Sequence, residues 1–302
     1  MSALRCLPVA SLTPRELLTH GALFGLCCVT TYKAGGPYFA ATLMAILACH
    51  EAGHFVVGRH HDAPVSLPYF IPLPWQVSLG TLGAVIRMDE PVRDRAKLFD
   101  IGIAGPLAGL AIAIPLLVIG LLRSKLIASV PGSNLEGNSI LYVLLKLAVF
   151  GRWLPSGGVD VQLHPMAFAG WVGLLITMIN LMPIGQLDGG HVARAALGDR
   201  HEVWSRRLHL ALPVVGLVVA SVMFVIARSA GKGVGGALAY AKYGAIPWFT
   251  WSLLLWYMRY QAGEYHPEVS PTPLGRGRQR AAIFMLVVFC LIATPVPFRP
   301  VL

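Results

Sequence analysis

The residues best suited to chemistry are two histidines and a glutamate in the stretch CHEAGHFVVGR, which runs from Cys49 to Arg59. On a helix, His50 and His54 are rotated by only about 40° and separated by about 6 Å of rise, so both imidazoles can reach one metal ion. Glu51 lies to the side of that pair, where it can contact a metal-bound water without being a ligand. The spacing therefore predicts a metal site with a base beside it.

This arrangement matches the HExxH motif, in which two histidines bind zinc and the glutamate is the general base. The alternative is a set of polar residues that neighbouring helices satisfy in a transporter. Ionisable side chains inside a membrane span are costly and mark a functional site in either case. The motif by itself leaves both interpretations open.

A catalytic zinc usually has three protein ligands and a water, so two histidines leave one ligand missing. The stretch NLMPIGQLDGGH, from Asn180 to His191, offers a candidate in Asp188. Its proline and glycines would interrupt a helix, and irregular backbone at membrane depth is tolerated only where it is buried or lines a wet cavity. Asp188 is well placed to be the third ligand; the alternative is a helix cap beside a glycine turn.

The elements that must position these residues are membrane helices. The chain has 302 residues, of which 56% are hydrophobic and 13% charged, and a mean hydropathy of +0.66; soluble domains have about 25% charged residues. We predict an all-α polytopic membrane protein with about six to seven transmembrane helices. The expected spans are 16–32, 38–58, 98–122, 166–193, 208–228, 243–260 and 281–297.

The net charge of +10 is explained by topology. With the N-terminus in the cytoplasm, most lysines and arginines fall in cytoplasmic segments, as the positive-inside rule requires. The basic clusters show no aromatic interleaving and no nucleic-acid fold pattern, so we expect anionic lipid headgroups rather than nucleic acid as their partners. The first span is expected to stay attached, because no compact signal peptide precedes it. The five cysteines show no CxxC spacing and predict neither a disulfide framework nor a cysteine zinc site.

Two connections carry further predictions. The stretch LPYFIPLPWQVSLGTLGAVIRM, residues 67–88, is rich in proline, glycine and β-formers, and predicts a membrane-associated loop and β-hairpin between spans two and three. Residues 123–165 are the longest connection outside the membrane, with an interfacial or re-entrant helix expected inside it. Residues 259–280 are expected to be a polar linker.

The chain resembles the site-2 protease family of intramembrane zinc metalloproteases, and most of all its compact archaeal, bacterial and plastid branch. The likeness covers about residues 38–197. Its motifs, in the family's order, are HEAGH at 50–54, LPYFIPLP at 67–74, SLGTLGAVIRM at 78–88, FDIGIAGPLAGL at 99–110 and NLMPIGQLDGGH at 180–191.

The resemblance implies that His50, His54 and Asp188 bind one zinc ion and that Glu51 is the catalytic base. It also implies that Asn180 contacts the substrate backbone or the developing oxyanion. The family commonly has proline two residues after this asparagine, whereas here Pro183 comes one place later, which leaves the orientation of Asn180 open. No other cofactor is expected.

We therefore expect three parts: an N-terminal segment and first span (1–37), a catalytic core (38–197) and C-terminal helices (198–302). The expected function is hydrolysis of transmembrane proteins near the cytoplasmic side of a prokaryotic inner membrane, within regulated intramembrane proteolysis. The alternative is a cation-coupled secondary transporter, and an inactive scaffold is disfavoured because every residue needed for the chemistry is present. The substrate's identity and the oligomeric state are not predicted.

Overall fold

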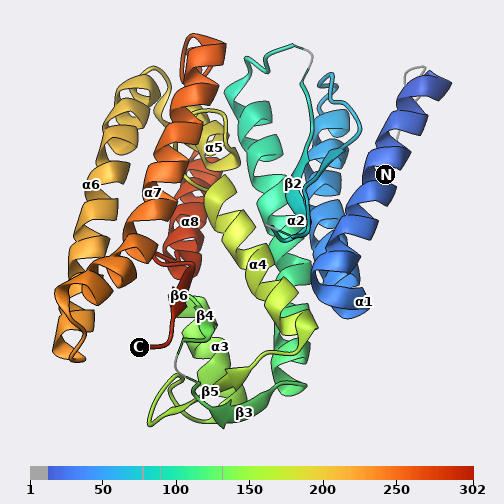
Figure 1. The fold of residues 1–302 in the computed structure, drawn as a ribbon. Helices are drawn as coiled ribbons and strands as arrows, with labels where there is room; N and C mark the ends of the chain where they lie inside the picture. Colours follow the sequence, from blue (N-terminus) through green and yellow to red (C-terminus); the bar gives the residue numbers. More distant parts are fainter. Residues whose placement is uncertain (1–12, 77, 89, 131) are drawn as a thin grey trace.

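The computed structural model describes residues 13–302 except 77, 89 and 131. Most of this part of the chain is helical, and three small two-stranded sheets accompany the helices (Figure 1). The expectation that no signal peptide is removed concerns residues 1–12, which lie outside the described part.

The first helix, α1 (Pro14–His60), carries the HEAGH residues in its last third. Thr13 begins it with a capping box, in which Thr13 and Glu16 bond to each other's backbone N–H groups. Gly36 breaks the helix with φ 78° and ψ −174°, a conformation that favours glycine, and Pro37 starts the second arm. The two arms fold back on each other in Figure 1 and correspond to the predicted spans 16–32 and 38–58.

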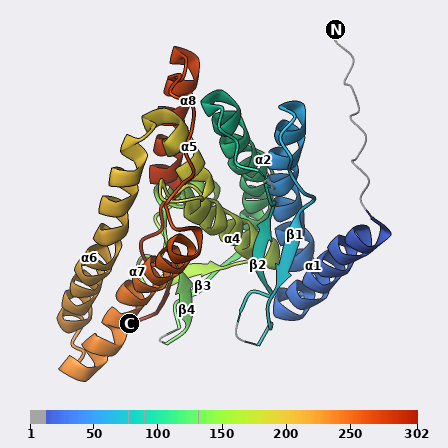
Figure 2. The same ribbon diagram turned by 90° about the horizontal axis from the view of Figure 1, so that it is seen from above.

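The predicted hairpin is present beside α1. Strands β1 (Tyr69–Pro72) and β2 (Thr81–Val85) pair antiparallel, and Figure 2 shows them next to α1 and α2 (Arg95–Leu122). The Thr30 hydroxyl donates to the carbonyl of Gly80 at 2.6 Å and joins the first arm of α1 to this hairpin. Asp94 caps α2 through the N–H of Lys97.

Two further strand pairs lie at the end of the molecule where α2 ends (Figure 1). They are β3 (Lys125–Ala128) with β5 (Val159–Gln162), and β4 (Asn134–Glu136) with β6 (Phe298–Pro300). These strands were not predicted from the sequence, because each has only three or four residues. The expected helix of this region is α3 (Ile140–Phe150). Burial lowers the pKa of its Lys146, whose Nζ lies 3.8 Å from Glu136 Oε1.

The predicted span 166–193 is divided. Helix α4 (Pro165–Asn180) ends before the proline and glycines, and α5 (Asp188–Leu197) starts after them. The chain continues as α6 (Arg200–Ser229), α7 (Val234–Ala262) and α8 (Arg276–Ile292). The linker expected at 259–280 is shorter than predicted, because α7 continues to Ala262 and α8 already begins at Arg276.

The core lies where the second arm of α1 packs between α2 and α4. Its fully buried side chains include Phe39, Leu43, Leu117 and Trp171. The indole of Trp171 donates to the carbonyl of Gly137 at 2.8 Å, so burial of this ring leaves no polar atom unpaired. Packing of this core places the HEAGH segment of α1 against α2.

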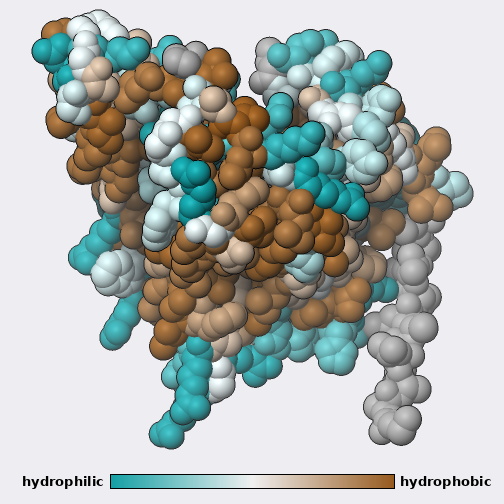
Figure 3. Space-filling model, turned by 90° about the horizontal axis from the view of Figure 1, so that it is seen from below, coloured by the Kyte–Doolittle hydropathy of each residue, from teal (hydrophilic) through white to brown (hydrophobic). Residues whose placement is uncertain are grey.

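Within the described residues, α1, α2 and α6 are both long and apolar enough to cross a membrane. Many large apolar side chains on the outer surfaces are exposed, including Leu210, Leu217, Leu253 and Ile283. Figure 3 shows hydrophobic side chains over much of the face seen from below, with hydrophilic ones in separate patches. A surface of this kind suits a lipid environment.

Candidate metal and active site

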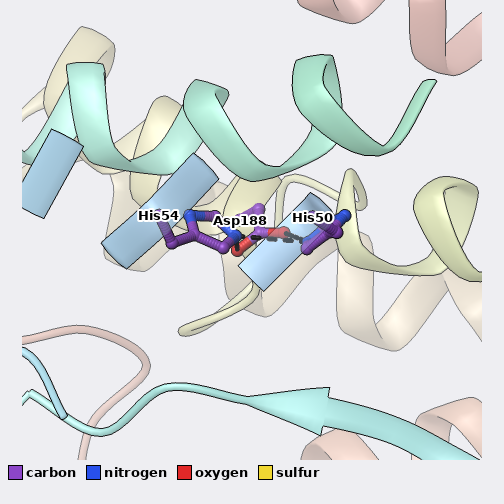
Figure 4. Close-up of side chains that lie close together, drawn as sticks. All are labelled: His50, His54 and Asp188. Atoms are coloured by element: carbon purple, nitrogen blue, oxygen red, sulfur yellow. Dashed lines mark hydrogen bonds and ion pairs between the residues drawn. The ribbon is translucent and has the colours of Figure 1, made fainter. Parts of the chain in front are cut away.

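His50, His54 and Asp188 converge on one point, although 138 residues separate His50 from Asp188 in the sequence. The Asp188 Oδ2 lies 3.1 Å from His50 Nε2, and Oδ1 lies 3.2 Å from His54 Nε2. The two Nε2 atoms are 3.2 Å apart. Figure 4 shows the three side chains pointing toward one another, the imidazoles from α1 and the carboxylate from the start of α5.

These donor atoms fit zinc. Zinc binds imidazole nitrogen and carboxylate oxygen at about 2.0–2.2 Å in tetrahedral geometry, which places neighbouring ligand atoms about 3.3 Å apart. The three separations of 3.1–3.2 Å are close to that spacing. Each of the three groups offers a lone pair, and a cation at their centre satisfies all of them at once.

The backbone of α2 fixes the tautomer of His54. Its Nδ1 lies 2.8 Å from the carbonyl oxygen of Ile101, which only accepts, so Nδ1 carries the proton. The lone pair of Nε2 then faces Asp188 and His50. A second hydrogen bond of this kind orients a metal-binding histidine and raises its basicity. Sequence reasoning missed Ile101 because a backbone carbonyl leaves no signal in a residue pattern.

Two glycines of α2 give the imidazoles their space. A Cβ on Gly105 would overlap the His54 ring at Nε2, and a Cβ on Gly109 would come within 3.1 Å of His50 Nδ1. Gly105 and Gly109 therefore let α2 pack closely against a neighbouring helix. The partner packed against them is the metal-binding edge of α1.

Gly105→Ala is expected to reduce bound zinc at least tenfold, because the added methyl group displaces the ring of His54 from its position opposite Asp188. Metal content of the purified protein checks this result. Gly25→Ala is the matched control, since a Cβ at Gly25 meets nothing within 4 Å. Equal zinc in both variants would contradict the packing argument.

The two remaining predicted site residues lie beside the metal site. Glu51 is 3% exposed and follows His50 directly on α1. Asn180 is the last residue of α4, and its Nδ2 lies 3.4 Å from His50 Nε2. The later position of Pro183 therefore does not remove the Asn180 amide from the site. The catalytic roles of Glu51 and Asn180 remain predictions.

Asp188 does not act as a helix cap. The N-cap of α5 is Leu187, which makes no side-chain cap hydrogen bond, and the Asp188 carboxylate is used by the two histidines. As the first residue of α5, it stands at the positive end of the helix dipole, which favours a carboxylate. The Asp188 anion is thus held in place by both α5 and α1.

A second group of histidines packs behind α5. The Nδ1 of His266 lies 2.9 Å from the carbonyl of Pro267 and donates to it, so Nε2 accepts from His191 Nδ1 at 2.8 Å. His201 from α6 stacks edge-on to His266 with 5.8 Å between ring centroids. The contact between His191 and His266 attaches α5 to the linker between α7 and α8. His266 was missed, since it stands alone in the sequence.

The stability of the protein is expected to fall as the pH drops from about 6.5 to about 4. Burial, reinforced by Arg194, lowers the pKa of His266 from 6.5 to about 4, so the unfolded chain takes up a proton before the folded one. The loss attributable to His266 reaches about 3 kcal/mol at the acid end. Thermal unfolding in detergent across this range, compared with His266→Gln, should show a flatter dependence in the variant. The exposed His60→Gln serves as control, and parallel curves for all three would contradict the assignment.

The histidines after the motif do not join the metal site. His61 Nε2 lies 3.0 Å from Asp100 Oδ2, and Arg278 bonds to both oxygens of the same carboxylate at 2.7 and 2.8 Å. These contacts join the end of α1, the start of α2 and the start of α8. No ligand role was predicted for His60, His61 or Asp62, and the structure gives them none.

Fold and site together define a helical membrane protein with a metal site of two imidazoles and one carboxylate buried among its helices. The chain belongs to peptidase family M50, whose family model matches residues 38–223. The resemblance to the site-2 protease family is thereby confirmed, and His50, His54 and Asp188 form a group that could hold a metal ion.

Curated relatives of the chain include several plant proteins. The chain is 36% identical over 162 residues to "Probable zinc metalloprotease EGY1, chloroplastic" of Oryza sativa subsp. japonica, covering 52% of this chain and 27% of the relative. It is 34% identical over 184 residues to "Probable zinc metalloprotease EGY2, chloroplastic" of Oryza sativa subsp. indica, covering 60% and 33%. The "EGY3" protein of the same subspecies is 26% identical over 280 residues, covering 86% and 42%. The chain thus spans less than half the length of these relatives.

No solved structure matches the chain. The expected prokaryotic inner membrane does not fit the relatives, which are named chloroplastic. The prediction of a prokaryotic inner membrane, which rested on the compactness of the chain, was therefore wrong. Chain length does not distinguish one membrane from another. What the helices and the relatives support is a membrane protein.

Proposed function

We propose that this chain hydrolyses peptide bonds of transmembrane proteins, in the manner of an intramembrane zinc metalloprotease. One observation carries the proposal: His50 and His54 on α1 meet Asp188 on α5 with the spacing of zinc ligands, next to Glu51 and Asn180. Regulated intramembrane proteolysis is the corresponding biological process. The transporter alternative gains no support from the family match.

The roles of the side chains follow from their positions. Bound zinc supplies Lewis acidity, which polarises the scissile carbonyl and lowers the pKa of water to about 7. Glu51 takes the proton from the attacking water and passes it to the leaving amine. The Asn180 amide donates to the oxyanion that develops on the carbonyl. The packed core around α1, α2 and α4 holds these groups in place while the peptide bond of the substrate is hydrolysed.

A transmembrane substrate must be unwound before its backbone can reach the site, because helical hydrogen bonds cover its peptide groups. Strand β2 offers a template for the unwound segment, since among the described residues it has only one neighbouring strand, β1. The side chain of Leu82 in β2 is 58% exposed and that of Val85 is 50% exposed. Addition of the substrate as a third strand would present an extended backbone near the zinc.

Leu82→Pro is expected to reduce cleavage at least tenfold more than Leu82→Ala, with zinc content unchanged in both. Proline removes a backbone donor and restricts φ, whereas alanine shortens the exposed side chain and keeps the N–H. Initial cleavage rates with one transmembrane substrate measure the difference. Equal rates for the two variants would count against strand addition.

We further propose six to seven spans. The two arms of α1, then α2, α4, α6, α7 and α8, alternate in direction along Figure 1. The arginine-rich starts of α6 and α8 lie at the same end of the molecule as the C-terminal end of α1. By the positive-inside rule, this end faces the cytoplasm or the compartment equivalent to it. Cleavage is expected near that face.

The test is reconstitution of the purified chain in liposomes with single-span proteins of varied sequence. Product termini within the membrane segment, formed with zinc and lost on chelation and in Glu51→Gln, would support the proposal. Ion flux or solute uptake without any cleavage would favour the transporter instead.

A further inference from the structure

An apolar groove of about 380 Å³ opens between α5, α6 and α8. Its walls come from Val192 and Leu197 of α5, Trp204 of α6, and Ile283 and Leu286 of α8. Several of these side chains are far from buried: Ile283 is 65% exposed, Leu286 53% and Trp204 46%. The lining of the groove also includes Gly189 and Leu181, the neighbours of Asp188 and Asn180 in the chain.

Four arginines lie on α6 and α8 within about one or two helical turns of the residues that line this groove. Arg200 and Arg207 are four residues before and three residues after Trp204, so they share its face of α6, and the Arg207 guanidinium lies 5.5 Å from the Trp204 ring centre. On α8, Arg280 lies one turn before Ile283 and Arg276 a further turn before that. All four are exposed. Side chains on a helix lean toward its N-terminus, which directs these guanidinium groups to the water-facing starts of α6 and α8.

The acids near these arginines have other partners. The carboxylate of Asp199 lies 3.2 Å from Arg194, and Glu202 accepts from the N–H of Tyr265. Asp100 binds Arg278, the remaining arginine of this part of α8. The rim of the groove therefore presents positive charge above an apolar slot.

We propose that this groove holds one acyl chain of an anionic phospholipid whose phosphate binds the arginines at the starts of α6 and α8. The apolar walls match an acyl chain, and the basic rim matches a phosphate, which arginine binds in bidentate fashion. The bound chain packs against Gly189 and Leu181, so this lipid supports the turn between α4 and α5 that presents Asp188.

The experiment is tryptophan quenching by brominated acyl chains, with the full chain in phosphatidylcholine vesicles. Either brominated phosphatidylglycerol or brominated phosphatidylcholine is added at one tenth of the lipid. Because the chain has seven tryptophans, the signal of Trp204 is the difference between the native protein and Trp204→Phe. We expect the anionic lipid to quench this signal at least twice as strongly as the neutral one. The double variant Arg207→Gln/Arg280→Gln should remove that preference, whereas Arg152→Gln/Arg228→Gln, away from the groove, should keep it.

Equal quenching by the two lipids would overturn the proposal, because it would show ordinary boundary lipid only. Displacement of the anionic lipid by a single-span peptide would also overturn it and assign the groove to substrate. Soluble glycerophosphoglycerol should leave the quenching unchanged. If it displaced the anionic lipid, the site would bind a headgroup without holding an acyl chain. These binding results do not depend on proteolysis, so they stand or fall separately from the proposed function.

Discussion

Glu51→Gln is expected to lower the cleavage rate about a thousandfold while zinc content stays near one per chain. The glutamine keeps the size of the side chain on α1 but cannot take a proton from water, and loss of a general base costs about 10²–10⁴-fold in rate. Glu51 is next to His50 without being one of the three convergent ligands, so the metal should remain. Initial rates with one transmembrane substrate, together with metal analysis, measure both quantities.

Glu264→Gln is the matched control, because Glu264 is exposed on the linker after α7. This variant should cleave at the native rate. If Glu51→Gln kept more than a tenth of the native activity, the base would have to be another group. If it lost zinc as well, Glu51 would be part of the metal site itself.

Asp188→Ala is expected to reduce zinc from near one per chain to less than one tenth, and cleavage to background. The change removes one of three ligands and leaves two imidazoles, which do not complete a structural or catalytic zinc site. His54→Ala should have the same effect, since its Nε2 is 3.2 Å from the same carboxylate. Mass spectrometry of metals in protein purified in detergent is the measurement.

Asp199→Ala controls for the loss of a carboxylate near the same helix, because the Asp199 side chain is 95% exposed. It should retain its zinc and elute from gel filtration as the native protein does. Zinc retained in Asp188→Ala would show that the third ligand lies elsewhere. No zinc in any variant or in the native chain would refute the protease proposal.

Much of the site could be predicted from local spacing. The i, i+4 relation of His50 and His54 follows from helix geometry alone, and the proline and glycines after Asn180 predicted a break where α4 ends and α5 starts. The β-forming residues of 67–88 likewise predicted the hairpin that β1 and β2 form. The short strands β3 to β6 could not be predicted in this way, because three or four residues carry too little pattern.

The sequence by itself determined the helical membrane class, the metal-binding pair on α1 and the chemical type of the third ligand, because composition and local periodicity depend on neighbours in the chain. Only the tertiary structure decided that the Ile101 carbonyl sets the tautomer of His54, that Gly105 makes room for its ring and that His266 anchors α5. These contacts join residues from 47 to 75 positions apart. Such pairings depend on how helices pack, and no local pattern encodes them.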